Sequence, residues 1–132
     1  MMNSATNKEN ILIIEDDSNL VSLLSGRLES AGYKTEIATD GEKALIEIEK
    51  KPDLILLDIM LPKLSGLDVM KIIREKDEWG KKVPIIITSN LNPDDDHIIS
   101  SVAKYSPAFY LVKANYSLEE IIEKIKSVLL TK

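Results

Sequence analysis

The sequence predicts an α/β fold in which a parallel sheet is covered by helices on both faces. Three observations lead to this prediction. Four short apolar runs are continuous rather than alternating, a helical pattern of apolar residues follows each predicted strand, and 132 residues leave room for one domain. Apolar residues make up 44% of the chain, which is enough to build a core between the sheet and its helices.

The predicted strands are short. Continuous apolar runs are typical of strands that are buried on both faces, as in parallel sheets. A fifth run, residues 34–38, alternates polar and apolar side chains, and this pattern predicts a strand at an edge of the sheet. The four continuous runs are Ile11–Ile14, Leu54–Leu57, Ile85–Ile87 and Phe109–Val112.

Apolar residues at helical spacing follow every predicted strand. Gly32 is expected to end the first helix in a left-handed cap, and Asp40 is expected to cap the start of the second. Ser117 and Glu120 predict a capping box at the start of the last helix. The five predicted apolar helix faces lie within residues 20–28, 44–48, 67–73, 98–103 and 118–130. Right-handed crossovers then place helices on both faces of the sheet.

The composition argues against several classes of protein. The net charge is −5 and the sequence pI is about 4.9, so direct binding of nucleic acid is not expected. Cysteine is absent, and no apolar run approaches the length of a membrane helix, so neither disulfides nor membrane insertion is expected. Residues 1–9 are predicted to be a disordered leader, residues 10–130 to form the domain, and the cytoplasm is the expected location.

Polar side chains follow the predicted strands where their carboxyl ends should meet. Acidic residues 15–17 follow the first strand, Asp58 follows the third, residues 88–90 (Thr-Ser-Asn) follow the fourth, and Lys113 follows the fifth. In a doubly wound sheet these ends form the usual ligand site. Each residue alone could be an ordinary solvated loop residue. Their joint placement at four strand ends favours a shared site.

The residue types at this edge predict a specific chemistry. Converging carboxylates repel one another unless a cation neutralises them, and a set of oxygen ligands favours Mg²⁺. A carboxylate beside Mg²⁺ can attack phosphorus and form an aspartyl phosphate. The metal, a lysine and a hydroxyl could then hold the oxygens of the transferring group.

These motifs resemble the receiver domain of two-component response regulators, in the CheY-like superfamily, over about residues 10–130. The resemblance implies a flavodoxin-like doubly wound sheet of five strands, in the order 2-1-3-4-5, with five helices. It rests on the sequence ILIIEDD at residues 11–17, ATDGEKAL at 38–45, PDLILLDIMLP at 52–62, SG at 65–66, PIIITS at 84–89 and YLVK at 110–113.

The resemblance implies that Asp58 is the phosphoacceptor. Glu15 and Asp16 would form the acidic pair that binds Mg²⁺ together with Asp58, and Met60 would offer its backbone carbonyl to the metal. The pair Asp16 and Asp17 is an alternative, since three acids follow the first strand. The apolar run ends at residue 14, which favours Glu15 and Asp16.

The resemblance also implies a switch. Ser89, five residues after Pro84, matches the switch hydroxyl, and Tyr110 matches the aromatic residue that turns inward on activation. Lys113 matches the lysine that pairs first with the acceptor and then with its phosphate. Here Ala114 follows this lysine in place of the usual proline, so we expect either a trans bond with a shifted loop or a strained cis bond.

A second departure lies before the fifth strand, where Ser106-Pro107-Ala108 replaces the usual glycine. Both departures fall on the face of the fourth predicted helix, the fifth strand and the fifth predicted helix, through which receivers commonly contact their downstream protein target. A histidine kinase or a phosphotransfer protein would be the phosphoryl donor. The domain would be a monomer or a phosphorylation-dependent dimer, and a stand-alone receiver rather than an enzyme that turns over external substrates.

Two other functions fit parts of this pattern. One is a receiver-like scaffold or binding module that is never phosphorylated. The other is a phosphatase-like hydrolase with an aspartate nucleophile. Such hydrolases place a second aspartate two residues after the first, and Met60 at that position argues against this reading.

Overall fold

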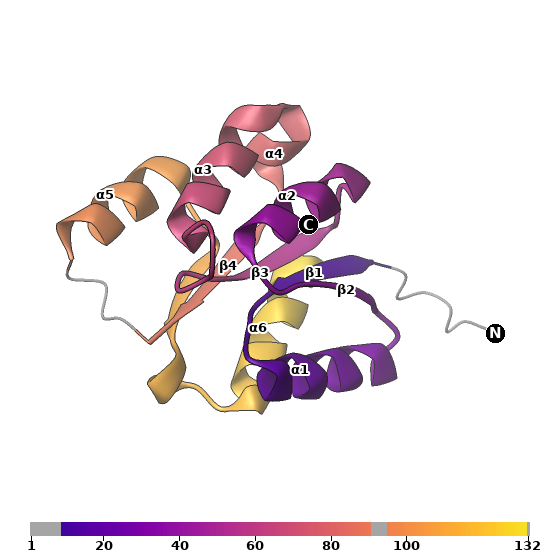
Figure 1. Ribbon diagram of the computed structural model, residues 1–132. Coiled ribbons are helices and arrows are strands. Elements are labelled where there is room, and N and C mark those ends of the chain that lie inside the picture. Colours follow the sequence, from indigo (N-terminus) through magenta and orange to yellow (C-terminus); the bar gives the residue numbers. More distant parts are fainter. Residues whose placement is uncertain (1–8, 91–94, 132) are drawn as a thin grey trace.

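The computed structural model describes residues 9–90 and 95–131, and the predicted leader lies outside these ranges except for Glu9. Five parallel strands form one sheet in the order β2-β1-β3-β4-β5 (Figure 1). This arrangement confirms the predicted fold class and strand order. The strands are β1 (Asn10–Ile14), β2 (Lys34–Ala38), β3 (Leu54–Asp58), β4 (Ile85–Ser89) and β5 (Phe109–Val112).

Helices cover both faces of the sheet. One face packs against α1 (Ser18–Ser30) and α6 (Leu118–Leu130), and the other packs against α2 (Gly41–Glu47), α3 (Gly66–Lys76) and α5 (Asp96–Tyr105). Alternation along the strands divides the core: in β1, Leu12 and Ile14 belong to one layer, whereas Ile11 and Ile13 belong to the other. Burial on both faces explains why the central strands are continuously apolar.

The predicted helix caps are present. The Asp40 carboxylate accepts a hydrogen bond from the Lys43 backbone N–H at 2.8 Å, and Ser117 with Glu120 forms the capping box of α6. Gly32 has φ of 99° just after α1, in the left-handed region that glycine adopts without strain. Local sequence therefore determines where these helices begin and end.

The structure adds one short α-helix to the five predicted, α4 (Glu78–Lys82), between α3 and β4. Within α4, the Trp79 indole N–H donates to the Pro52 carbonyl oxygen at 3.1 Å, which ties this helix to the amino end of β3. Two 3₁₀ turns are also present, η2 (Ile48–Lys50) and η3 (Lys113–Asn115).

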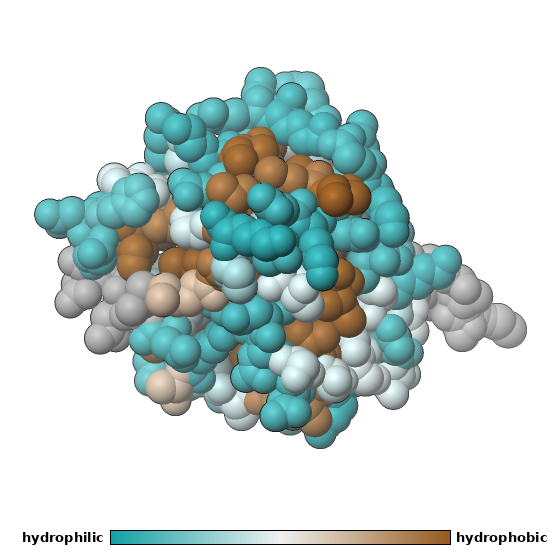
Figure 2. All heavy atoms as spheres, in the orientation of Figure 1, coloured by the Kyte–Doolittle hydropathy of each residue, from teal (hydrophilic) through white to brown (hydrophobic). Residues whose placement is uncertain are grey.

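Strand β5 lies at an edge of the sheet, opposite the edge formed by β2. Although the sequence of β5 is continuously apolar, only Leu111 in it is buried, and the other three residues are half-buried. Hydrophilic side chains cover most of the face seen in Figure 2, and hydrophobic atoms appear there as separate patches. Among the described residues, every helix is too short or too polar to cross a bilayer.

Candidate functional site

Three carboxylates converge at the carboxyl ends of the neighbouring strands β1 and β3. Asp58 is the last residue of β3, and Glu15 and Asp16 directly follow β1. One oxygen from each of the three residues lies within 4.8 Å of the others. Glu15 and Asp58 are each only 3% exposed, whereas Asp16 is open to solvent. The pairing of β1 with β3 produces this convergence across more than 40 residues of sequence.

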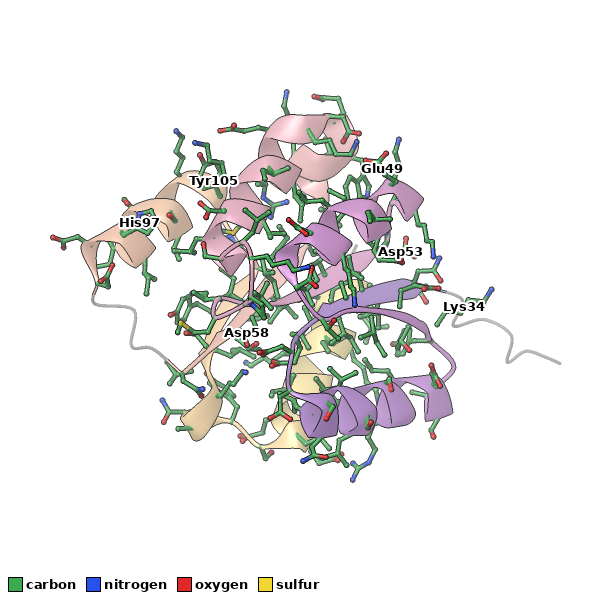
Figure 3. All side chains as sticks on the ribbon, viewed as in Figure 1. Lys34, Glu49, Asp53, Asp58, His97 and Tyr105 are labelled. Carbon is green, nitrogen blue, oxygen red and sulfur yellow. The ribbon has the colours of Figure 1, made fainter. Side chains whose placement is uncertain are left out.

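The Asp58 carboxylate is held from two sides. Its Oδ1 accepts a hydrogen bond from the Met60 backbone N–H at 3.2 Å, and its Oδ2 accepts one from Lys113 Nζ at 3.2 Å. Figure 3 shows Asp58 at the end of the central sheet, between the helices of the two layers. Both oxygens thus have donors, which fixes the orientation of the carboxylate.

Gly66, the first residue of α3, packs directly behind Asp58. A Cβ atom at position 66 would lie 2.2 Å from the Asp58 carbonyl oxygen and 2.7 Å from the Ile59 Cα atom. The Gly66 backbone N–H donates to the Ile59 carbonyl oxygen at 2.8 Å. Only glycine allows this approach, so Gly66 sets the position of the loop that carries Asp58 and Met60.

Lys113 extends from the end of β5 to the acidic cluster. Its Nζ lies 2.9 Å from Glu15 Oε1 and 3.2 Å from Asp58 Oδ2. Burial disfavours the charged ammonium, but the hydrogen bonds and negative charges of Glu15 and Asp58 outweigh it and raise the pKa of Lys113. The described residues contain no cis peptide bond, so the bond to Ala114 is trans, and η3 carries the chain onward.

Glu15 has an unfavourable environment for its charge. Burial raises the pKa of Glu15, and the negative charge of Asp58 adds to this rise, while the hydrogen bond from Lys113 opposes it. Glu15 Oε2 also accepts a hydrogen bond from the Asp17 backbone N–H at 3.2 Å. An additional cation beside Glu15 and Asp58 would relieve their mutual repulsion.

The two alternative acidic pairs differ in the structure. Asp17 is the N-cap of α1, and its Oδ1 accepts hydrogen bonds from the Asn19 and Leu20 backbone N–H groups. Glu15 and Asp16 instead lie in the cluster with Asp58. The three clustered carboxylates supply oxygen ligands only, which is the donor set that Mg²⁺ prefers. The residues present therefore fit a hard divalent cation.

The remaining predicted site residues lie around this cluster. Ser89 is fully buried at the end of β4, one residue beyond Thr88, which pairs with Asp58 in the sheet. Tyr110 lies in β5, half-buried against the core layer of α2, α3 and α5. The Met60 side chain is 57% exposed, and its backbone N–H donates to Asp58. The roles predicted for Ser89, Tyr110 and the Met60 carbonyl stay predictions.

Sequence reasoning assigned no role to Gly66 and left the role of Asp17 open. The dipeptide Ser65-Gly66 belongs to the motif, but the local sequence does not signal that this glycine packs against Asp58. For Asp17, a usable signal was present, since an aspartate followed by a predicted helix is a frequent N-cap.

Comparison with known proteins agrees with this arrangement. The family model described as "Response regulator receiver domain" matches residues 11–126. The chain is 35% identical to the alkaline phosphatase synthesis transcriptional regulatory protein PhoP of Bacillus subtilis, over 90% of this chain and 48% of that protein. It is 32% identical to the transcriptional regulatory protein CpxR of Escherichia coli, with the same two coverages. The chain thus spans about half the length of these relatives.

A solved structure resembles the fold closely. The receiver domain of a Francisella response regulator superposes with a TM-score of 0.79 at 29% sequence identity, covering 95% of this chain and all of that one. The similarity therefore extends over both layers of helices and the whole sheet.

Proposed function

Because the chain belongs to the family of response regulator receiver domains, we propose that Asp58 accepts a phosphoryl group and that the domain acts as a phosphorylation-dependent switch of a two-component system. The observation that carries this proposal is the setting of Asp58. Its carboxylate is 3% exposed, lies beside two further carboxylates, and contacts the Lys113 ammonium at 3.2 Å. A structural aspartate would not need this combination of like charges and one half-buried lysine.

The proposed step is a phosphoryl transfer from a phosphohistidine of a histidine kinase or of a phosphotransfer protein. An Asp58 carboxylate oxygen forms a bond to phosphorus, while the bond between phosphorus and the histidine nitrogen breaks and its electron pair stays on the imidazole. The Lys113 ammonium, already 3.2 Å from Asp58, would pair with an oxygen of the transferred group. The Ser89 hydroxyl would donate to another oxygen.

The metal in this proposal is Mg²⁺. Glu15, Asp16 and Asp58 would hold it with side-chain oxygens, and Met60 would hold it with its backbone carbonyl. When bound, Mg²⁺ supplies positive charge that offsets the negative charge of the phosphoryl oxygens. Lys113 already supplies one charge of the same sign at the cluster, so the chain itself provides part of this electrostatic stabilisation.

The switch itself would follow from the added charge. A phosphoryl group on Asp58 adds negative charge where two other carboxylates already lie, and this draws Lys113 and Ser89 toward the phosphate. Tyr110 would then turn inward, and the balance between two conformers would shift. The face built by α5, β5 and α6 would carry this change to a downstream protein target.

Intact-mass measurement after incubation with phosphoramidate and Mg²⁺ tests the proposal. We expect one adduct of a single phosphoryl group in the wild type and none in Asp58→Asn. Asp96→Asn, an exposed carboxylate on α5, is the matched control and should keep the adduct. An unmodified wild type would favour the scaffold alternative, and an adduct that survives Asp58→Asn would disprove Asp58 as the acceptor.

The wider setting is also proposed. We expect no turnover of an external substrate beyond self-phosphorylation and autodephosphorylation, and we expect the protein to act in the cytoplasm. The stand-alone arrangement stays a prediction. The curated relatives are about twice as long and are named as transcriptional regulators, and the proposed phosphoryl transfer requires only the residues described above.

A further inference from the structure

A cavity of about 250 Å³ lies between α3 and α5, on the opposite side of α3 from α2. Each helix contributes one cation to the lining, Lys71 from α3 and Lys104 from α5. No role in phosphoryl transfer is proposed for any residue of this lining. The full lining is Leu67, Asp68, Lys71, His97, Ser100, Ser101, Lys104 and Tyr105.

The charges in this cavity differ from those of the whole chain. The protein carries a net charge of −5, whereas the lining contains two lysines and one carboxylate, with His97 as a further nitrogen donor. The described residues offer neither Lys71 nor Lys104 an ion pair, although Lys104 lies over the Tyr105 ring. The Asp68 carboxylate accepts a hydrogen bond from Ser65 at 3.1 Å. The local balance is therefore positive, since the single carboxylate of Asp68 offsets only one of the two lysines.

Ser101 provides a second, independent observation. Its side chain is 8% exposed and lines the cavity, yet in the described part of the chain its hydroxyl takes part in no hydrogen bond. The Oγ atom is not enclosed, so water in the cavity can reach it. Serines in a helix interior usually bond back to a carbonyl of the preceding turn, as Ser100 does to His97 at 3.1 Å. The Ser101 hydroxyl is instead free to donate to a ligand in the cavity.

We propose that this cavity binds a small ligand that carries a phosphate group. Lysine ammonium groups and hydroxyls are common phosphate donors, whereas planar carboxylates are matched best by the fork of an arginine, and the lining contains none. Leu67 and the Tyr105 ring form an apolar wall, and the volume exceeds that of inorganic phosphate, so an organic phosphate ester fits the cavity better than the free ion. Figure 3 shows His97 and Tyr105 toward opposite ends of α5, so the lining spans most of this helix.

Binding here would connect two helices. A phosphate held by Lys71 of α3 and by Ser101 and Lys104 of α5 would fix the distance between these helices. Because α5 forms part of the proposed face for the downstream target, an occupied cavity would restrict that face without any contact to Asp58.

A titration followed by amide NMR shifts tests the proposal, with inorganic phosphate as the probe, no Mg²⁺, and constant ionic strength. Saturable shifts are expected in residues 67–71 and 97–105, with a dissociation constant in the millimolar range, about 1–10 mM. Succinate at the same ionic strength should bind at least about threefold more weakly. Absence of saturation, or equal binding of succinate, would overturn the phosphate assignment.

Three variants make the test specific. Lys71→Gln with Lys104→Gln should weaken phosphate binding about tenfold, and Ser101→Ala should weaken it about threefold. Lys82→Gln, at an exposed lysine of α4 outside this lining, should leave binding unchanged. Unchanged binding in the double variant would disprove the site.

The Asp58→Asn variant separates this proposal from the proposed function. The titration should give the same constant in that variant, because the cavity does not include the acceptor. Loss of the phosphate response in Asp58→Asn would mean that phosphate binds at the acceptor, and the cavity proposal would fail. The dispersion of the amide signals in the same NMR spectra shows whether each variant is folded.

Discussion

Two half-buried cations, Lys113 and Arg74, hold opposite ends of the sheet in different ways. Lys113 lies at the carboxyl end of β5 between two carboxylates, at 2.9 Å and 3.2 Å. Arg74 lies on α3 near the amino ends of β4 and β5, and it donates only to backbone carbonyls. These acceptors belong to Gly80, Val83, Tyr105 and Ser106, at 2.5–3.2 Å.

The two cations also differ in their acid–base behaviour. Burial lowers the pKa of the Arg74 guanidinium, since carbonyls offer no negative charge to oppose it, whereas Glu15 and Asp58 raise the pKa of Lys113. Backbone carbonyls do not change their charge, so the hydrogen bonds of Arg74 keep one arrangement. Carboxylate partners can bind a metal or a phosphoryl group, so Lys113 can exchange partners. The two ends of the sheet therefore differ, since one is fixed and the other is the end at which the proposed switch would act.

Removing Arg74 should have the largest effect on stability. Arg74→Met leaves the carbonyls at the ends of α4 and α5 without their donor, and we expect the free energy of unfolding to fall by about 3 kcal/mol. Urea denaturation measures this change. Lys71→Met, at an exposed lysine of the same helix, should change stability by less than about 0.5 kcal/mol. An equal loss in the two variants would remove the distinction between the fixed end and an ordinary surface.

Removing Lys113 should instead change metal binding. In Lys113→Met the two carboxylates lose a neighbouring positive charge, and we expect the affinity for Mg²⁺ to rise about tenfold, or about 1.4 kcal/mol. Titration calorimetry measures the affinity. Lys82→Met is the control and should bind Mg²⁺ as the wild type does. A weaker Mg²⁺ affinity in Lys113→Met would show that the lysine supports the metal site.

A smaller effect is expected beside Arg74. The Tyr105 hydroxyl donates to Glu75 Oε2 at 3.1 Å, which links the end of α5 to α3. Tyr105→Phe removes this hydrogen bond and keeps the ring, so a loss of about 1 kcal/mol is expected in urea denaturation. Tyr116→Phe is the matched control, since among the described residues no hydrogen bond to the Tyr116 hydroxyl is present. If both variants lose the same stability, the link between α5 and α3 has no energetic importance.

The smallest expected effect is a pH dependence of stability at the switching end. It is small because burial raises the pKa of Glu15 while the hydrogen bond from Lys113 lowers it. The pKa of Glu15 in the folded state lies above its ordinary value of 4.5. Its contribution to stability is therefore complete below pH 4.5 and is lost as pH rises through the folded-state pKa.

Relative to Glu15→Gln, the metal-free wild type should thus be most stable at acid pH and lose this advantage toward neutral pH. Urea denaturation across that pH range measures the difference. Glu123→Gln, at an exposed position of α6, should show no such trend. A wild type that gains stability with rising pH would contradict the predicted sign.

The sequence predicted the switching end better than the fixed end. Glu15 and Lys113 directly follow apolar strands and Asp58 ends one, and the parallel sheet brings such ends together, so their meeting could be predicted from order alone. Arg74 contacts backbone carbonyls up to 32 residues away. Every residue presents the same backbone carbonyl, whatever its side chain is. No residue type in the sequence therefore marks the carbonyls that Arg74 binds.

Short elements also escaped prediction, for related reasons. Helix α4 has five residues with a glycine in the middle, which is too short to display a helical period. Ser106, in the segment Ser106-Pro107-Ala108 before β5, adopts a left-handed conformation with φ of 48°. The hydrogen bond from Arg74 to the Ser106 carbonyl at 3.2 Å helps hold this backbone in place, which the local sequence could not indicate.

The position of Trp79 has a practical consequence. It is the single tryptophan of the chain, and its indole donates to Pro52 at the amino end of β3, whereas Asp58 ends that same strand. Intrinsic tryptophan fluorescence therefore reports from the fixed end, one strand length away from Asp58. An emission change on adding Mg²⁺ or a phosphodonor would be a long-range optical signal transmitted through β3, obtained without attaching any dye.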